Sequence, residues 1–313
     1  MRARADAAAA AHAGAPTATG NGTSSNGSDI RTSPLNVEEI TSFYEKGYVR
    51  PGKVFSDEQV EFLRGVVQRL SRQEEEAGRR YDLLDPTLWP DVDDPDNTPR
   101  DPAQSFDFLF NLWLTDDDFR AAVFNPTTAR WAAQLLGTTS VRLLEDNALN
   151  KSPSPHELRW HQDYSYWPLA QPNAVTAWIA LDDTTRHNGA MLMACGSQHL
   201  GERLPVVFGT GTPYLRESRP ASVAEVGDPE ALGLPVEVVE LAAGEVSMHS
   251  ALTWHASGPN LSDSGRRAMV MRYVADGTVW LGEQRYEYNY TDEEVGLAPG
   301  EPIGGRYFPV IPF

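Results

Sequence analysis

The sequence predicts an α+β, mainly β fold: a double-stranded β-helix (jelly roll) core braced by N-terminal helices. Before about residue 140, apolar residues recur at helical spacing. After Ser140 the chain changes to short runs of β-branched and apolar residues, which are typical of strands. Asn188-Gly189 and Ala243-Gly244 supply turn residues between these runs. Short strands after a helical layer favour a sandwich or jelly roll.

Three helices are expected in the N-terminal part. The first ends at Gly47, because glycine readily adopts the left-handed conformation that closes a helix. Ser56 begins the second with a capping-box pattern, and a third lies between Asn125-Pro126 and Gly137. The predicted strands are Val141–Asp146, Ala148–Ser152, Ala174–Leu181, Ala190–Ala194, Val236–Leu241, Val246–His249 and Ala268–Val274.

One domain, residues 35–313, is expected to follow a disordered tail, residues 1–34. The tail is rich in Ala, Gly, Ser and Thr, so it cannot bury enough apolar surface to offset the entropy of ordering. A signal or transit peptide is the alternative for its first residues. Residues 85–102 are dense in Pro and Asp and predict a long surface loop. The segment 85–110 is a candidate lid over the site.

Charge and cysteine content narrow the class of partner. The formal net charge of −18 repels phosphate backbones and anionic lipid, so nucleic acid and membrane surfaces are poor partners. It also weighs against a polyanionic substrate such as an acyl-coenzyme A. The single cysteine, Cys195, excludes an internal disulfide and any cysteine-based metal site. A reducing cytoplasm is therefore expected.

The segment 160–163, Trp-His-Gln-Asp, is a candidate metal site. In extended backbone, residues i and i+2 point to the same side, so His161 and Asp163 can bind one metal. Two histidines and one carboxylate on one face suit Fe(II) and leave coordination positions for a cosubstrate and O₂. The spacing alone is also compatible with a loop histidine that caps a turn. A later segment offers His255 as the third ligand, with His249 as the alternative.

Four ordered motifs resemble those of the phytanoyl-CoA dioxygenase family of Fe(II)/2-oxoglutarate oxygenases, and together they are more specific than any one of them. The resemblance runs from about Val37 to Tyr273. The motifs are Phe43–Val49, residues 160–163 with Tyr166, the hairpin from Asn188-Gly189 to Gly196-Ser197-Gln198-His199, and His255–Asn260 with Arg266.

The resemblance implies that His161, Asp163 and His255 hold the iron and that His249 does not. It also implies that 2-oxoglutarate and O₂ are consumed while an unactivated C–H bond of a small molecule, expected to be a specialised metabolite, is hydroxylated. The carboxylate at position 163 disfavours the related halogenases, which replace it with a small residue. Gln162 must point away from the metal, either to orient a ligand or to face solvent.

Cosubstrate contacts are also implied by the resemblance. Arg266 takes the far carboxylate of 2-oxoglutarate, a role that suits a guanidinium fork. Arg267 is the alternative, but adjacent strand residues face opposite sides and the family spacing favours Arg266. Ser257 adds a hydroxyl to the same carboxylate, Lys151 contacts the cosubstrate, and Trp178 forms a pocket wall. A solvated turn lysine and core packing are the alternatives for the last two.

Four aromatic residues flank the ligands and are candidate substrate walls, with core packing as the alternative for each: Tyr164, Tyr166, Trp167 and Trp254. Two other functions stay open. One is a jelly-roll metal enzyme that does not use 2-oxoglutarate, such as an isomerase or epimerase, which Arg266 and Ser257 argue against. The other is a non-catalytic relative that acts as a binding module, which the intact ligand triad argues against.

Overall fold

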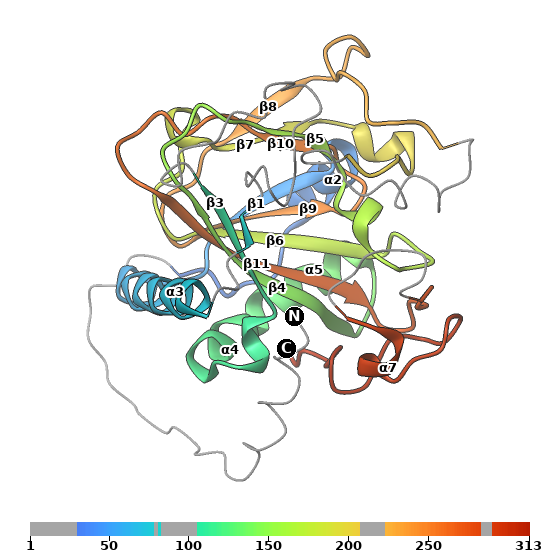
Figure 1. Cartoon of the computed structure of the whole chain (residues 1–313). Coiled ribbons are helices and arrows are strands. Elements are labelled where there is room, and N and C mark those ends of the chain that lie inside the picture. Colours follow the sequence, from blue (N-terminus) through green and yellow to red (C-terminus); the bar gives the residue numbers. More distant parts are fainter. Residues whose placement is uncertain (1–29, 78–80, 83–104, 207–222, 283–289) are drawn as a thin grey trace, which may run out of the picture.

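Two antiparallel sheets face each other at the centre of the molecule, and helices pack beneath the larger sheet (Figure 1). The larger sheet has seven strands in the order β1-β9-β6-β11-β4-β3-β2, and the smaller has four in the order β5-β10-β7-β8. The predicted mainly β class is confirmed. This computed structural model describes residues 30–77, 81–82, 105–206, 223–282 and 290–313.

The bounds of the elements follow the chain. The strands of the larger sheet are β1 (Tyr48–Lys53), β2 (Tyr81–Asp82), β3 (Phe106–Phe110), β4 (Val141–Lys151), β6 (Ala174–Ala180), β9 (Glu245–Ser250) and β11 (Arg266–Ala275). Those of the smaller sheet are β5 (Leu158–His161), β7 (Met191–Ala194), β8 (Val236–Val239) and β10 (His255–Ser257). The α-helices are α2 (Val37–Lys46), α3 (Asp57–Glu76), α4 (Asp117–Val123), α5 (Pro126–Leu136) and α7 (Asp292–Val295).

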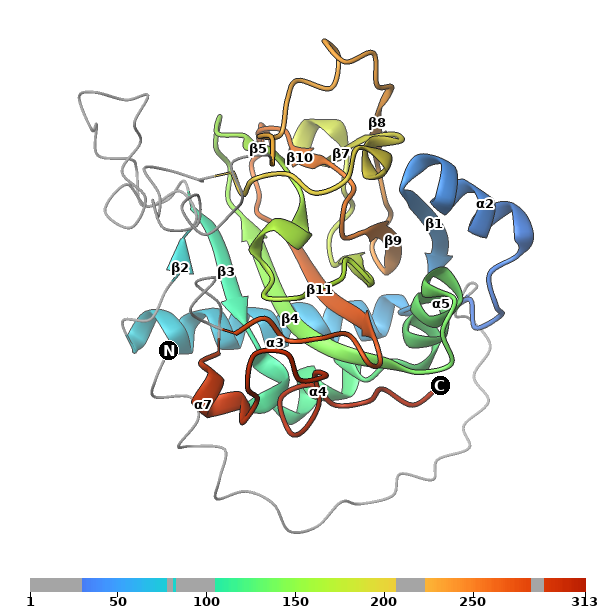
Figure 2. The same cartoon turned by 90° about the vertical axis from the view of Figure 1, so that its right-hand side faces the viewer.

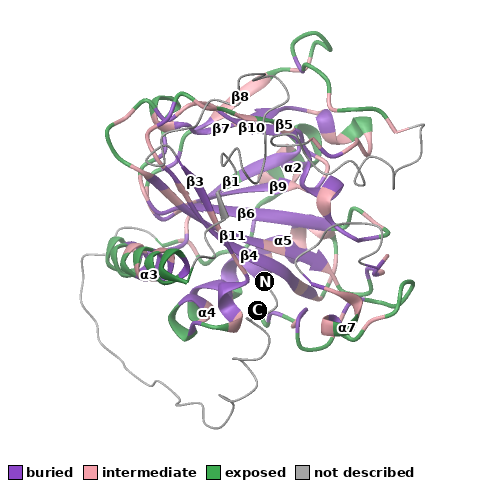
Figure 3. Ribbon diagram, in the orientation of Figure 1, coloured by how far each residue is buried: buried purple, intermediate pink, exposed green. Residues whose placement is uncertain are grey.

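The three predicted helices are confirmed with their caps. α2 ends at Gly47, whose φ of 90° is left-handed, and Ser56 forms the capping box of α3. Asn125 caps α5 and Gly137 ends it. Apolar side chains of α2 to α5 form one core with the outer face of the larger sheet. Figure 3 shows buried strands above α3, whose outward side is exposed.

The predicted strands recur with shifted bounds. The segments 141–146 and 148–152 form one continuous strand, β4, because β11 pairs along almost its whole length. The strands β5 and β10 were not expected, since segments of four and three residues carry little pattern. Residues 106–110 of the candidate lid form strand β3, which pairs with β4, and residues 83–104 lie outside the described residues.

Residues 1–29 of the expected tail lie outside the described ranges. Within residues 30–34, Arg31 pairs with Glu39 and stacks over the ring of Trp131, 5.6 Å from its centre. Among the described helices, none combines the length and the apolar character that crossing a membrane requires.

The inner face of the larger sheet looks toward the smaller sheet (Figure 2). Apolar side chains from both sheets, including Trp178, Val270 and Met193, fill part of the space between them. Polar side chains of the same strands occupy the rest, and they form the candidate site.

Candidate metal and cosubstrate site

Three buried side chains converge where β5 meets β10. His161 ends β5 and lies directly opposite His255, which begins β10. Asp163 follows at the start of the 3-10 helix η2 (Asp163–Tyr166). The candidate ligand atoms of these three residues all lie within 4.8 Å of one another. Two imidazoles and one carboxylate that converge in this way define a site of the non-haem iron oxygenase type.

The backbone orients both imidazoles. Nδ1 of His161 lies 2.8 Å from the carbonyl oxygen of Arg159, and Nδ1 of His255 lies 3.0 Å from that of Thr253. A nitrogen that faces a carbonyl donates, so the proton is on Nδ1 and Nε2 keeps its lone pair for a metal. Burial lowers the pKa of both imidazoles, which are therefore neutral, as metal ligands must be.

The Asp163 carboxyl is ionised. Burial by itself would raise its pKa, but the charge of Arg272 and the hydrogen bond with His249 contribute to holding the pKa well below its usual range. Oδ1 lies 3.6 Å from Nε2 of His255. Nε2 of His249 lies 3.3 Å from the other oxygen, Oδ2. His249 therefore contacts the carboxylate of Asp163 through Oδ2 and is not one of the three residues whose candidate ligand atoms converge.

Gln162 points away from the metal triad and is fully buried, so the solvent-facing alternative is wrong. Its amide nitrogen donates to the carbonyl oxygens of Gly201 and Leu252, each at 2.8 Å. Its amide oxygen accepts from the backbone N–H of Arg203 at 2.8 Å. Gln162 thus connects the segment of the candidate ligands His161 and Asp163 to the loop that precedes His255.

A second group of polar side chains lies at the start of β11, where Arg266 pairs with Lys151 of β4. Nζ of Lys151 donates to the hydroxyl of Ser257 at 3.0 Å. Ser257 donates to the carbonyl oxygen of Gly189 at 3.1 Å, and Arg266 donates to the same carbonyl. A Cβ atom on Gly189 would lie 2.8 Å from the carbonyl oxygen of Gly258, so glycine is required in this turn.

Two aromatic rings line this group. The Arg266 guanidinium lies 5.1 Å from the ring centre of Trp178 and 5.8 Å from that of Phe106, and Lys151 Nζ lies 5.4 Å from Phe106. Sequence reasoning missed Phe106, which it left inside a candidate lid. The alternation Phe-Asp-Phe-Leu-Phe at residues 106–110 is the signal that indicates a strand there.

Arg266 and Arg267 face opposite ways, as strand alternation predicts. Arg267 makes a bidentate pair with Asp182, with Nε at 2.8 Å and Nη2 at 2.7 Å. Arg266 is buried beside Lys151, and within the described ranges neither of these two cations forms an ion pair with a carboxylate. Of the two arginines, Arg266 is the one placed to receive a ligand from the inner space.

The residues present fit 2-oxoglutarate. Burial lowers the pKa of Arg266 to about 10. Burial and the charge of Arg266 lower that of Lys151 to about 7. The buried Nε atom of Arg266 has no hydrogen-bond partner among the described residues. A bound carboxylate would compensate the charge of these two buried basic groups and accept a hydrogen bond from the unused donor.

The four candidate substrate walls lie in different surroundings. The ring of Tyr166 lies 6.3 Å from that of His161, and its hydroxyl donates to the carbonyl of Val206 at 2.5 Å. Tyr164 and Trp167 belong to an apolar cluster beneath η2. Trp254 is buried under the guanidinium of Arg203.

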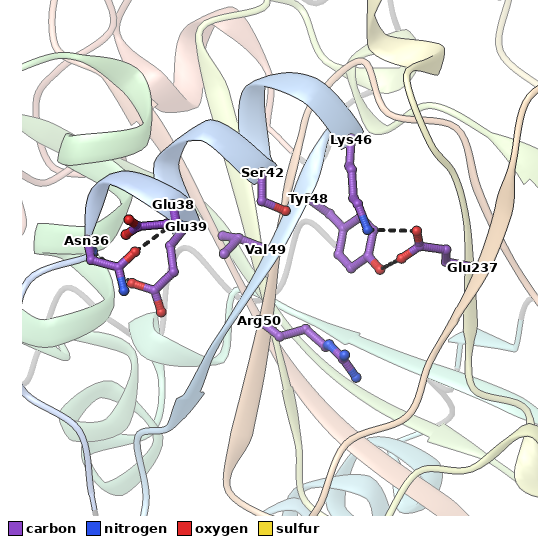
Figure 4. A pocket seen from close by; sticks show the side chains of 9 residues that line it. All are labelled: Asn36, Glu38, Glu39, Ser42, Lys46, Tyr48, Val49, Arg50 and Glu237. Carbon is purple, nitrogen blue, oxygen red and sulfur yellow. Dashed lines mark hydrogen bonds and ion pairs between the residues drawn. The ribbon is translucent and has the colours of Figure 1, made fainter.

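A separate hollow of about 300 Å³ lies between α2, β1 and β8 (Figure 4). Two charged residues of its lining pair with each other: Glu237 accepts from Lys46 at 2.8 Å and also from the hydroxyl of Tyr48. None of the predicted site residues lines it. This hollow is therefore distinct from the metal and cosubstrate site.

A family model described as phytanoyl-CoA dioxygenase matches residues 43–268, well over half of the chain. The chain belongs to the phytanoyl-CoA dioxygenase family. The resemblance inferred from the four motifs is thereby confirmed, and so is the enzyme class, a 2-oxoglutarate-dependent non-haem iron dioxygenase, at the level of the family.

Two curated relatives are named for different substrates. A probable alpha-ketoglutarate-dependent hypophosphite dioxygenase of Stutzerimonas stutzeri is 32% identical over 139 residues, which are 44% of this chain and 46% of that protein. The match thus spans about half the length of that relative. An ectoine dioxygenase of Bordetella bronchiseptica is 24% identical over 76% of this chain and 75% of its own.

Solved structures share the fold. The alpha-ketoglutarate-dependent carbocyclase SnoK from nogalamycin biosynthesis has a TM-score of 0.66 at 24% identity, over 88% of this chain and 96% of its own. The epimerase SnoN, in complex with Fe3+, alpha-ketoglutarate and nogalamycin RO, has a TM-score of 0.65 at 21% identity, over 88% and 97%. At these identities the likeness establishes the fold alone.

Proposed function

We propose that this chain holds Fe(II) through His161, Asp163 and His255 and uses 2-oxoglutarate and O₂ to hydroxylate, or otherwise oxidise, an unactivated C–H bond of a small molecule. The observation that carries the proposal is the convergence of two neutral histidines and one carboxylate, together with the buried side chains of Lys151 and Arg266, which pair across β4 and β11. The two facing antiparallel sheets support a double-stranded β-helix as the scaffold, within one domain over residues 35–313.

The protein's own residues position the reactants. Arg266 binds the far carboxylate of 2-oxoglutarate, Lys151 and Ser257 add donors to the same end, and Trp178 walls the pocket. When bound, iron and 2-oxoglutarate supply the oxidative chemistry, in which O₂, 2-oxoglutarate and the C–H bond yield succinate, CO₂ and the hydroxylated product. Burial of the triad excludes bulk water from the reacting centre.

For the substrate we infer a specialised metabolite or modified small acid. The structural neighbours include enzymes of nogalamycin biosynthesis, and the relatives include an L-proline trans-4-hydroxylase of Streptomyces griseoviridis. Tyr164, Tyr166, Trp167 and Trp254 are the proposed walls, of which Tyr166 is nearest to a ligand imidazole by the contacts described above. A cytoplasmic location is consistent with the single, buried Cys195.

The test is a screen of candidate metabolites for substrate-stimulated succinate release by the Fe(II)-loaded protein. We expect release to require 2-oxoglutarate and O₂ and to be absent in Asp163→Ala. Turnover of a metabolite without 2-oxoglutarate would instead support a metal enzyme of another kind. A folded protein that binds neither Fe(II) nor 2-oxoglutarate would support a binding module and contradict the proposal.

A further inference from the structure

A row of polar side chains crosses the larger sheet on its inner face. His249 of β9 lies opposite Thr176 of β6, Thr176 lies opposite Arg272 of β11, and Arg272 lies opposite Glu145 of β4. Directly paired residues point to the same side of a sheet. These four residues, the polar row, are nearly or fully buried. Burying polar groups costs free energy unless they have hydrogen-bond or charge partners, so the partners of these four side chains indicate what the row does.

Three members of the row converge on one atom, Oδ2 of Asp163. The hydroxyl of Thr176 donates to it at 2.5 Å, Nε2 of His249 lies at 3.3 Å, and Nε of Arg272 lies at 3.7 Å. Oδ1 is turned instead toward His255. The row therefore distinguishes the two oxygens of the carboxylate.

Arg272 is itself held in place. Its Nη1 atom lies 2.9 Å from Oε1 of Glu145 and donates to the side-chain oxygen of Asn147. The guanidinium lies 5.8 Å from the ring centre of Trp167. Because Glu145 balances its charge, Arg272 can stay beside Asp163 without being an uncompensated buried cation.

We propose that Thr176, His249 and Arg272 are positioning residues. Their contacts hold Oδ2 of Asp163, so that only Oδ1 of this carboxylate binds the metal. A carboxylate that is free to turn can present both oxygens to one ion and occupy a further coordination position. Holding one oxygen keeps that position for cosubstrate and O₂. The inference rests on the proposed function, because it takes the ion at the triad to be the catalytic iron.

Thr176 gives the sharpest test, because valine has nearly its shape but no hydroxyl, and serine retains the hydroxyl. The purified full chain is titrated with Fe(II) without oxygen, and with Co(II) in air, in the absence of 2-oxoglutarate. We expect Thr176→Val to weaken metal binding about 10- to 100-fold, the range seen when partners of metal ligands are removed. Thr176→Ser is expected to stay within a few-fold of the wild type.

Two readouts separate positioning from a general structural effect. The visible absorption of bound Co(II) responds to coordination number, so it changes in Thr176→Val and not in Thr176→Ser. The affinity for 2-oxoglutarate at saturating metal is expected to fall in Thr176→Val and not in Thr176→Ser, because a carboxylate that binds through both oxygens occupies a position that the cosubstrate needs. The melting temperature of the metal-free protein is expected to stay the same in both variants. If Thr176→Val fails to fold, the double variant Arg272→Gln/Glu145→Gln removes the cation and its counter-charge together and is expected to weaken metal binding in the same range.

Equal metal affinity and equal Co(II) spectra in Thr176→Val and Thr176→Ser would overturn the positioning role while leaving the proposed function intact. Failure of the wild-type protein to bind Fe(II) would instead overturn the proposed function. The two failures are therefore distinguishable.

Discussion

Arg266 and Arg272 lie on the same strand, six residues apart, and an even spacing places both on the inner face of the larger sheet. Their surroundings differ. Arg272 is paired with Glu145 and lies beside Asp163, whereas Arg266 contacts a carbonyl oxygen and two aromatic rings and lies next to a second cation, Lys151.

The difference indicates two uses for a buried arginine. The positive charge of Arg272 is compensated by the carboxylates of Glu145 and Asp163, so it needs no ligand to compensate it. Arg266 lacks such a match among the described residues, and burial lowers its pKa to about 10. A buried cation without a counter-charge costs free energy, which an incoming dianion offsets. This contrast separates the end of the site that we propose binds cosubstrate from the end that we propose positions the metal ligands.

The largest effect is expected at the proposed metal site, His161, Asp163 and His255. His255→Ala removes a proposed iron ligand. The affinity for Fe(II) should therefore fall by more than about 100-fold, the upper end of the loss seen when a hydrogen-bond partner of a metal ligand is removed. Succinate release should be lost as well. An anaerobic Fe(II) titration measures the first and product analysis the second. The exposed His199, replaced by alanine, is the control and should behave as the wild type.

The next effect concerns stability. Arg272→Gln removes the buried cation that faces Glu145 and Asp163 and should lower the free energy of unfolding by about 3 kcal/mol. Arg266→Gln removes an unmatched buried cation and should leave the free energy of unfolding unchanged or slightly higher. Urea unfolding of the metal-free variants measures both. Equal losses in the two variants would erase the contrast between the arginines.

Binding of 2-oxoglutarate is expected to depend on Arg266 and not on its neighbour Arg267. Arg266→Gln removes a charge-assisted bidentate contact and should raise the KM for 2-oxoglutarate about 100-fold. Arg267→Gln, which loses a partly exposed pair with Asp182, should change the KM by less than about threefold. A larger effect at Arg267 would reverse the assignment of the two residues.

Within about half a pH unit of neutrality, the smallest effect is a pH dependence that comes from Lys151. The pKa of its amine is about 7 in the free protein, so a growing fraction is neutral as the pH rises above 7. Binding a dianion then requires proton uptake, and affinity for 2-oxoglutarate should fall by up to about tenfold per pH unit above pH 7. Below pH 7 this contribution is constant. Lys151→Met should bind more weakly, with a flat profile between pH 7 and pH 9 on calorimetric titration.

Local patterns predicted only part of this site, and the roles of His255, Arg266 and Lys151 were expected from the resemblance to the family. The i and i+2 rule placed His161 and Asp163 together, and strand alternation separated Arg266 from Arg267. Helix ends followed from caps such as Ser56, whose hydrogen bonds are made within a few residues.

The remaining features depend on pairing between distant segments. The polar row exists because the register of β6, β9 and β11 places Thr176, His249 and Arg272 side by side, and no local pattern specifies that register. Phe106 was missed for the same reason, since it reaches the cosubstrate end only through the pairing of β3 with β4.

The central claim is that one ferrous ion and one 2-oxoglutarate bind together in the space between the sheets. Its most direct test is an anaerobic titration of the Fe(II)-loaded protein with 2-oxoglutarate, followed by visible absorption. We expect a weak visible band that saturates at one equivalent and is lost in His255→Ala. Binding of Fe(II) without any band at saturating 2-oxoglutarate would contradict it.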